Sequence, residues 1–183
     1  RSTRSTRSAA NGWCPACSTL QSANTSVYET LNMWLDYNTR ALHTFVSNPD
    51  VIAMNSLWQK SLVEEMAANY PYMYLVSTTD VNGVNKVRSD DQPVASYKDR
   101  FWFQNALRGA TITYETQIGR TLNKPTLVVS MPIINPTKQI VGVGMFAANL
   151  DRIFDIVKGI QLGNGGSAFI VDQRNVVVSH SDP

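Results

Sequence analysis

The stretch YKDRFWFQNAL, residues 97–107, places a guanidinium group among acidic and aromatic neighbours. Arg100 follows Asp99 directly, and Trp102 and Phe103 come two and three positions later. A guanidinium is a rigid fork of N–H donors, so it can hold a ligand with paired hydrogen bonds. It can equally pair with Asp99 or Asp90 and organise a loop, while the aromatic residues fill the core. The stretch therefore raises two alternatives, a binding site or the buried side of a helix.

Few other residues of the sequence could take part in catalysis or metal binding. Both cysteines fall in GWCPACSTL, a spacing also found in redox proteins, where the first thiolate follows a buried strand. Residues 8–12 cannot form that strand, so we expect an incidental Cys14–Cys17 pair or a flexible lead-in; the spacing does not decide whether the pair is a disulfide. The only histidines, His43 and His180, lack metal-ligand spacing. We predict no catalytic residues, no metal, no cofactor and no enzyme.

Length and charge narrow the classes further. The chain of 183 residues suits one domain, or one domain plus part of a second. Charged residues make up 16% of it, against about 25% on average, and the net charge of +2 is too small to indicate a nucleic-acid partner. No stretch reaches the roughly 18 apolar residues of a membrane span. The polar run that opens the chain predicts a disordered or tag-like lead-in over residues 1–17.

Two helical segments follow the lead-in. Apolar residues recur at three- and four-residue spacing over residues 18–47, which predicts one long amphipathic helix of about 45 Å. Asn48-Pro49-Asp50 ends it, because proline disfavours helix in the residue before it and starts the next helix well. A second helix is predicted over residues 49–69.

The rest of the chain has the pattern of strands. Strands are predicted at 72–80, 85–89, 110–116, 126–134 and 139–150, with a short helix at 97–107. This order predicts an α+β, PAS-like module over residues 48–150, built on a five-stranded antiparallel sheet with helices on one face. A connecting helix is expected within residues 151–165. Residues 166–183 are expected to form the first hairpin of a second module.

Five stretches, taken in order, resemble the extracellular double-Cache sensor domains of bacterial and archaeal chemoreceptors, histidine kinases and cyclic-dinucleotide enzymes. They are the long N-terminal helix, KDRFWFQNAL, QIGRTLNKPTLVVSMPI, IVGVGMFAANLDRI and GNGGSAFIVDQRNVVVSHSDP. The resemblance covers roughly residues 18–183. It implies that residues 48–150 are the distal, ligand-binding module and that residues 166–183 open the membrane-proximal module.

The resemblance also implies a site. In the amino-acid-sensing branch, an arginine and a tryptophan two residues later hold the ligand carboxylate, an aromatic residue follows, and an aspartate on the last distal strand pairs with the ligand ammonium. Arg100, Trp102 and Phe103 match the first three. Ala147 stands where the aspartate belongs, and a buried ammonium without a counter-charge is costly. A short organic acid or an uncharged-amine ligand therefore fits better than an α-amino acid.

Further pocket residues depend on strand register. Glu115, Asp80 or Asp90 could replace the missing aspartate, and spacing does not choose among them. Trp102 and Phe103 are adjacent and point apart on a helix, so we expect one of them to line the pocket. A register error of one residue would turn every strand residue to the other face. The remaining predicted pocket residues are Tyr74, Ser77, Tyr97, Tyr114 and Ser130.

The function implied is that of an extracellular or periplasmic input domain of a transmembrane receptor. We expect it to bind a small carboxylate-bearing molecule, organic-acid or amino-acid-like, and to form a weak homodimer through the helix at 18–47. We also expect the native protein to be anchored in the membrane by segments outside this sequence. The alternative is a ligand-free dimerisation or protein-interaction module with the same fold.

Overall fold

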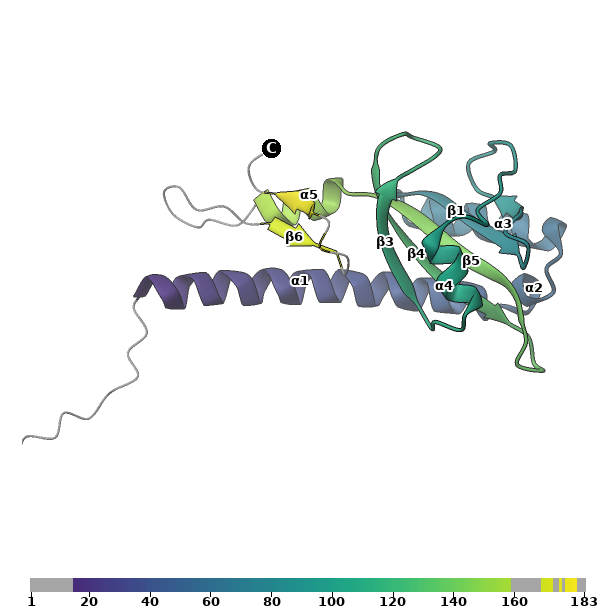
Figure 1. Cartoon of the computed structure of the whole chain (residues 1–183), viewed down its shortest axis with the longest axis horizontal. Helices are drawn as coiled ribbons and strands as arrows, with labels where there is room; N and C mark the ends of the chain where they lie inside the picture. The colour runs from purple at the N-terminus through teal and green to yellow at the C-terminus, as the bar shows by residue number, and fades with distance from the viewer. Residues whose placement is uncertain (1–14, 159–168, 173–174, 176, 181–183) are drawn as a thin grey trace, which may run out of the picture.

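The computed structural model describes residues 15–158, 169–172, 175 and 177–180. Its longest element is helix α1, Pro15–Val46, with 32 residues. The C-terminal part of α1 lies against the sheet, and its N-terminal part extends well beyond the sheet (Figure 1). The long helix predicted over residues 18–47 is thus present and begins at Pro15. Residues 1–14 of the predicted lead-in, including Cys14, lie outside the described residues.

The segment predicted as one helix over residues 49–69 forms two. Helix α2, Pro49–Ile52, is capped by the Asn48 side chain, and α3, Ser56–Asn69, is capped by the Asn55 side chain. Between them Met54 adopts a positive φ of 54°, which a continuing helix does not tolerate. Asn55 is a strong N-cap residue, and this local preference divides the segment.

Five strands form one antiparallel sheet in the order β2-β1-β5-β4-β3. The outer pairs are held by the central strand β5, which lies between β1 and β4. The strands predicted from the sequence are all present, with ends shifted by a few residues. Their bounds are β1 Met73–Asp80, β2 Asn85–Arg88, β3 Thr113–Ile118, β4 Pro125–Ile134 and β5 Ile140–Asn149.

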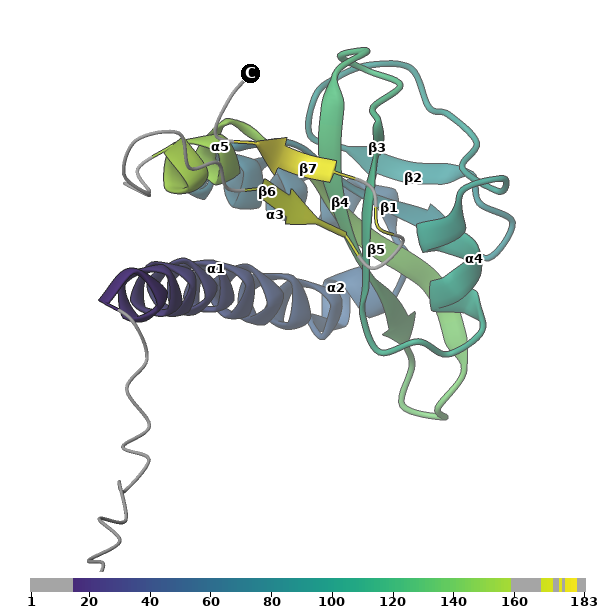
Figure 2. The same ribbon diagram turned by 60° about the vertical axis from the view of Figure 1, so that its left-hand side comes forward.

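Helices cover both faces of this sheet, not one face as the sequence predicted. Helices α1 and α3 pack on one face, and α4, Phe101–Leu107, packs on the other against β3, β4 and β5 (Figure 2). We call these the α1 face and the α4 face. Successive strand residues alternate between the two faces, and nearly all residues of β4 and β5 are buried because both faces are covered. On the α1 face Gly144 lies so close to the helix that an added Cβ would be 2.5 Å from Val46 Cγ1.

The short helix begins later than predicted. Residues 97–100 form a turn closed by the bond from the Arg100 N–H to the Tyr97 carbonyl, at 2.9 Å. Arg100 keeps an extended backbone at the N-cap position, so the helix proper begins at Phe101. It ends before Gly109, whose φ of +91° suits glycine at the end of a helix.

The last described elements lie beside α1. Helix α5, Asp151–Lys158, is followed by the hairpin of β6, Phe169–Val171, and β7, Val177–His180. The β6–β7 hairpin and α1 both contribute residues to the lining of a mostly apolar cavity of about 230 Å³. The predicted module boundaries at residues 150, 165 and 166 stay predictions. Residues 159–168, 173–174, 176 and 181–183 of the predicted connecting segment and hairpin lie outside the described residues.

Candidate ligand-binding site

Two neighbouring cross-strand rows form the floor beneath α4. One row runs through Glu115, Val128, Ala147 and Leu75, and the other through Thr113, Ser130, Met145 and Ser77. Contacts with α4 fix the orientation, because Asn105 of the helix donates to Thr113 Oγ1 at 2.8 Å and Ser130 Oγ donates to the Trp102 carbonyl at 3.1 Å. The register thus brings together predicted residues from β1, β4 and β5.

Arg100 and Trp102 stand at the start of α4, above this floor. Arg100 is half-buried and donates from Nη1 to Gln117 Oε1 at 2.7 Å. Trp102 is 0% exposed, and its backbone N–H donates to Glu115 Oε2 at 2.9 Å. Among the residues that the structure describes, none accepts a hydrogen bond from Arg100 Nε or Trp102 Nε1, although both atoms are buried. Two donors are therefore held in place with their hydrogen-bonding capacity unused.

The aromatic residues close this face in the structure. The Tyr97 and Trp102 rings have centroids 5.4 Å apart, and the Trp102 and Phe103 rings meet edge to face at 6.0 Å. All three side chains are buried. Burial of both side chains does not decide which of Trp102 and Phe103 would line a ligand pocket, so the expectation that one of them does stays a prediction.

Glu115 is the acidic residue on this floor. Its carboxylate is buried, in the same cross-strand row as Ala147 and two strands away, which is about 10 Å at the usual strand spacing. The other two candidates are occupied elsewhere. Asp80 accepts from the N–H groups of Asn82 and Val84 in the β1–β2 turn, and Asp90 is paired with an arginine. Among the three, the structure places only Glu115 beneath α4.

Arg88 of β2 organises the other side of the site. It is buried, with Nε and Nη2 donating to the two oxygens of Asp90 at 2.8 and 2.7 Å and Nη1 donating to Tyr97 Oη at 2.8 Å. Nη2 also donates to Thr121 Oγ1 at 3.0 Å. Burial lowers the pKa of Arg88, but the bonds to Asp90 and Tyr97 outweigh it and leave the pKa raised. Arg88 thus remains charged and ties the loop after β2 to the loop after β3.

A second arginine fastens the same two loops at the surface. Arg120 donates from Nη2 to both oxygens of Asp99, at 2.9 and 2.7 Å, and from Nη1 to the Ser96 carbonyl. Its guanidinium carbon lies 5.7 Å from the centroid of the Tyr97 ring. The alternative in which Arg100 pairs with Asp99 or Asp90 is therefore wrong: Asp99 binds Arg120, and Asp90 binds Arg88. Arg100 is left with Gln117.

Tyr74 lies at the edge of the site, where the chain is tightly packed. Its hydroxyl hydrogen-bonds Thr126 Oγ1 at 3.0 Å. Gly119 packs against the same pair, since an added Cβ there would be 2.5 Å from Tyr74 Oη and 2.9 Å from Thr126 Oγ1. Burial raises the pKa of Tyr74, because the phenolate is poorly solvated there.

The predicted pocket residues do not all lie on the same face of the sheet. Tyr114 does not join the others: it lies on the α1 face, and its hydroxyl hydrogen-bonds Thr39 Oγ1 of α1 at 2.8 Å. In β3 the residues Thr113, Glu115 and Gln117 contact α4 or Arg100, so Tyr114, which alternates with them, faces α1. Ser77 is buried on the floor, and its Oγ has no partner among the described residues. The α4 face brings together Arg100, Trp102, Phe103, Tyr74, Ser77, Tyr97, Ser130 and Ala147.

The sequence analysis missed three residues around this site. Arg88, Gln117 and Arg120 each bind a residue of the stretch 97–107. Arg88 alone had a sequence indication, because a charged residue at an inward position of a short strand needs a partner. Arg120 lies in a loop whose path the sequence does not reveal.

Within the described ranges, no group of three or more His, Cys, Asp or Glu side chains could hold a metal ion. No described helix is both long enough and apolar enough to cross a membrane.

Several solved structures share this fold. The ligand-binding domain of the Campylobacter jejuni chemoreceptor Tlp3, in complex with 4-methylisoleucine, has a TM-score of 0.73 at 15% identity, over 93% of this chain and 75% of that chain. The sensor domain of the V. cholerae histidine kinase DctB has a TM-score of 0.72 at 18% identity, over 89% of this chain and 66% of that one. The ligand-binding domain of the Pseudomonas fluorescens chemoreceptor CtaA, in complex with L-serine, has a TM-score of 0.71 at 17% identity, over 86% of this chain and 69% of that chain. No curated protein matches the chain in sequence.

A family model agrees with these structures. The model of the Cache domain matches residues 17–183, which is almost the whole chain. The match begins in α1, contains the sheet with α4 on its far face, and continues through the β6–β7 hairpin. The chain is therefore a member of the Cache domain family, in its double-Cache form.

Proposed function

We propose that this chain is the non-catalytic, ligand-sensing input domain of a transmembrane receptor, and that it binds a small carboxylate between α4 and the sheet. The observation that carries the proposal is the pair of buried donors, Arg100 Nε and Trp102 Nε1, that no described residue satisfies. A buried donor left unpaired costs about 1–3 kcal/mol. A ligand carboxylate supplies acceptors for both, and it gains a charge-assisted bond from the guanidinium.

The charges on the floor decide which carboxylates fit. Ala147 offers no counter-charge to a ligand amine, which favours a short organic acid. Glu115 offers one from the same cross-strand row, and Arg100 with Glu115 would complement a zwitterion. The solved relatives in complex with 4-methylisoleucine and L-serine support including α-amino acids in the screen. The proposed ligand class is a carboxylate, and the variant Glu115→Gln tests whether the ligand also carries an amine.

Signal transfer follows from the position of the sheet. Strands β4 and β5 contact α4 on one face and α1 on the other (Figure 2). A ligand that draws α4 toward the floor therefore acts on the same strands that support α1. We propose that occupancy favours a conformation with α1 displaced, as expected when a ligand binds one of two states more tightly.

The test is a ligand screen followed by binding measurements on variants of Arg100. Thermal shift against organic acids, amino acids, amines and purines should identify a ligand, since a compound at 100 times its Kd stabilises by about 2.7 kcal/mol. Calorimetric titration of Arg100→Ala should then show binding weakened by roughly tenfold to 150-fold, because a charge-assisted hydrogen bond contributes about 1.5–3 kcal/mol. Arg100→Lys should restore little, since a point charge does not reproduce the fork.

Arg108→Ala is the matched control. Arg108 is an exposed arginine at the other end of α4, so its removal changes the net charge equally and should leave affinity unchanged. If Arg100→Ala binds the ligand with unchanged affinity, the ligand site does not lie at residues 97–107. A fall in melting temperature of Arg100→Ala that is the same with and without ligand would assign Arg100 to loop structure alone.

A second candidate is a homodimer through α1, and exposed apolar residues favour it. Tyr28, Met33 and Tyr37 of α1 are each at least 60% exposed. We propose weak association of two copies along this helix, with or without ligand. Sedimentation velocity should show a monomer–dimer mixture that Met33→Glu shifts to monomer. A strict monomer at high concentration would contradict the interface.

The compartment is part of the proposal. Family membership supports a place on the extracellular or periplasmic side of the cytoplasmic membrane, between hydrophobic segments on either side of this sequence. The parent gene tests it directly: absence of hydrophobic segments on both sides would contradict a membrane anchor.

A further inference from the structure

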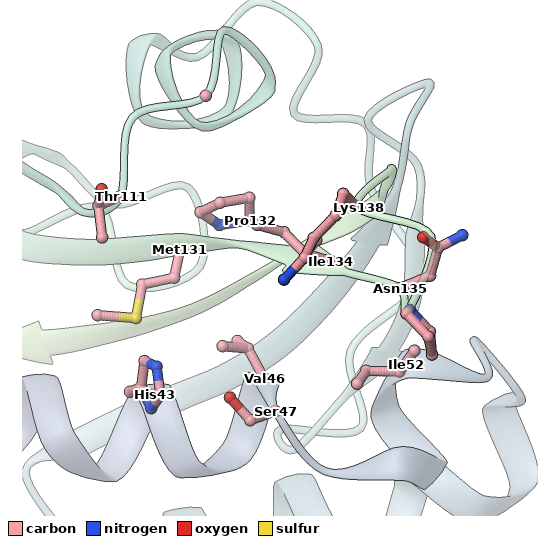
Figure 3. Close-up of a pocket in the computed structure, with 12 residues that line it drawn as sticks. His43, Val46, Ser47, Ile52, Thr111, Met131, Pro132, Ile134, Asn135 and Lys138 are labelled. Atoms are coloured by element: carbon pink, nitrogen blue, oxygen red, sulfur yellow. The ribbon is translucent and has the colours of Figure 1, made fainter.

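A separate cavity lies where strand β4 extends past its neighbour. The pairing of β3 with β4 ends at Thr113 and Ser130, so Met131–Ile134 has β5 on one side and no strand of the sheet on the other. The space is bounded by the last turn of α1, by Ile52 of α2 and by the segment after α4 (Figure 3). Its volume is about 460 Å³, within the range of roughly 300–1,000 Å³ typical of small-molecule sites.

The walls of this cavity are largely apolar. Buried Val46, Met131 and Pro132 form its inner surface, and half-exposed Ile134 lies at its mouth. A few polar side chains join them, among them Thr111. A mainly apolar lining with a small number of polar groups is the usual composition of a ligand site. The body of a ligand bound here would be apolar.

Lys138 is the lysine of this cavity, and the described lining contains no aspartate or glutamate. Lys138 has a positive φ of 66° in the β4–β5 turn, which is held by the bond from its N–H to the Asn135 carbonyl at 2.9 Å. From this turn its side chain runs back over the cavity with the ammonium directed inward (Figure 3). Lys138 belongs to none of the ion pairs found among the described residues.

We propose that this cavity is a second ligand site and that it takes a monocarboxylate with an apolar body, such as an aryl or short-chain fatty acid. The carboxylate binds Lys138, and the apolar body packs on Val46, Met131 and Ile134. A single ammonium suits a singly charged group, whereas a phosphate would call for several donors in a fork or nest. The site is independent of the one beneath α4, because it shares none of its residues.

The position of this site gives it direct contact with α1. His43, Val46 and Ser47 come from the end of that helix, whereas the site beneath α4 reaches α1 only through the sheet. A bound acid here would therefore bias the position of α1 without occupying the α4 face. The two sites would act on one helix from opposite faces of the sheet.

The test uses 4-fluorophenylacetate, followed by ¹⁹F NMR and calorimetric titration. The wild-type chain should bind it, and Lys138→Gln should bind at least tenfold more weakly. Lys124→Gln, which removes an exposed lysine of the β3–β4 loop, is the matched control and should bind as the wild type does. The neutral amide of the probe should bind the wild type at least tenfold more weakly than the acid and should not distinguish Lys138→Gln from the wild type.

Two further variants locate the bound probe. Thr111→Trp places a large side chain at the mouth of the cavity from an exposed position, so it should abolish binding without altering the core. Arg100→Ala alters only the site beneath α4, so the part of the binding that depends on Lys138 should remain. The proposal is overturned if the wild type does not bind at millimolar probe, if Lys138→Gln binds equally well, or if Arg100→Ala abolishes binding, since the probe would then occupy the site beneath α4.

Discussion

Arg120 holds both carboxylate oxygens of Asp99 from a single guanidinium nitrogen, at 2.9 and 2.7 Å. Asp99 immediately precedes Arg100, so this bond joins the β3–β4 loop to the segment that leads into α4. Both partners are partly exposed, at 41% and 65%, and an ion pair so placed is weak enough to open. This ion pair can therefore hold the segment before α4 against the β3–β4 loop and can also release it.

Arg120→Ala should loosen these loops without unfolding the domain. An exposed ion pair contributes roughly 0–1 kcal/mol, so we expect only a small fall in melting temperature. Hydrogen exchange at residues 96–99 and 119–124 should become faster, and exchange in β5 should stay unchanged. Arg108→Ala serves as the control. Equal exchange rates in the wild type and Arg120→Ala would show that the bond does not hold the loops.

Arg88→Met should lower the free energy of unfolding by about 3–5 kcal/mol, because it leaves a largely buried carboxylate at Asp90 without its partner. The double variant Arg88→Met with Asp90→Leu should recover part of that loss, since neither charge then remains. Denaturation in urea measures both, and Lys86→Met, an exposed site on the same strand, should be near neutral. A double variant no more stable than the single one would count against the pair.

Glu115→Gln tests the ligand amine. Glutamine keeps an oxygen that can accept from the Trp102 N–H, so the fold should survive. If the amine is held by Glu115, an α-amino acid should lose at least tenfold in affinity, and the matching acid without the amine should gain because repulsion is removed. Parallel changes in both ligands, measured by calorimetry, would limit Glu115 to supporting α4. Ala147→Asp complements this test and should shift preference toward ligands with an ammonium group.

Gly119→Ala should destabilise the domain. A Cβ at this position would lie 2.5 Å from Tyr74 Oη, and overpacking of this kind typically costs about 1–3 kcal/mol. Tyr74→Phe removes the obstructing oxygen, so the double variant should be more stable than the sum of the two single changes predicts. Urea denaturation of the wild type, the two single variants and the double variant measures the coupling between the two changes. If their effects on the free energy of unfolding simply add, the predicted clash is contradicted.

Tyr74 should also make stability fall at alkaline pH. Burial raises its pKa in the folded state above the ordinary value of 10.0. Above that pH the unfolded chain loses the phenol proton while the folded chain still retains it, so the unfolded state is favoured until pH passes the raised pKa. Tyr74→Phe should lack this part of the alkaline loss. Unfolding free energies of the two proteins between pH 8 and pH 11 make the comparison; parallel curves would refute it.

Much of the fold could be predicted because local patterns and tertiary packing agree. The repeating apolar positions of α1, the turn residues between β4 and β5, and Pro49 as a helix start each act over a few residues. The prediction of a single helix over 49–69 failed at Met54, whose left-handed backbone has no residue-type indication. The placement of helices on both faces was missed because strands that are apolar throughout do not show which element covers them.

The site was less predictable than the fold. The stretch around Arg100 could be identified because its residue types and their spacing resemble a known family pattern. Tyr114 was assigned to the wrong face, because the alternation along a strand shows which residues share a face but not which element covers that face, and Tyr114 lies on the face opposite to Thr113 and Glu115. Arg120 and Gln117 could not be found at all, since their roles depend on long-range contacts between loops that no local pattern encodes.

Gly144 gives the sheet an unusual mechanical property. Its neighbours Met145 and Ala147 face α4, while Gly144 itself brings the backbone of β5 against Val46 with no side chain between them. Side chains act as compliant spacers that absorb small shifts by changing rotamer, and here that spacer is missing. We therefore expect a displacement of β5 perpendicular to the sheet to reach the end of α1 with little loss of amplitude, as through a rigid linkage.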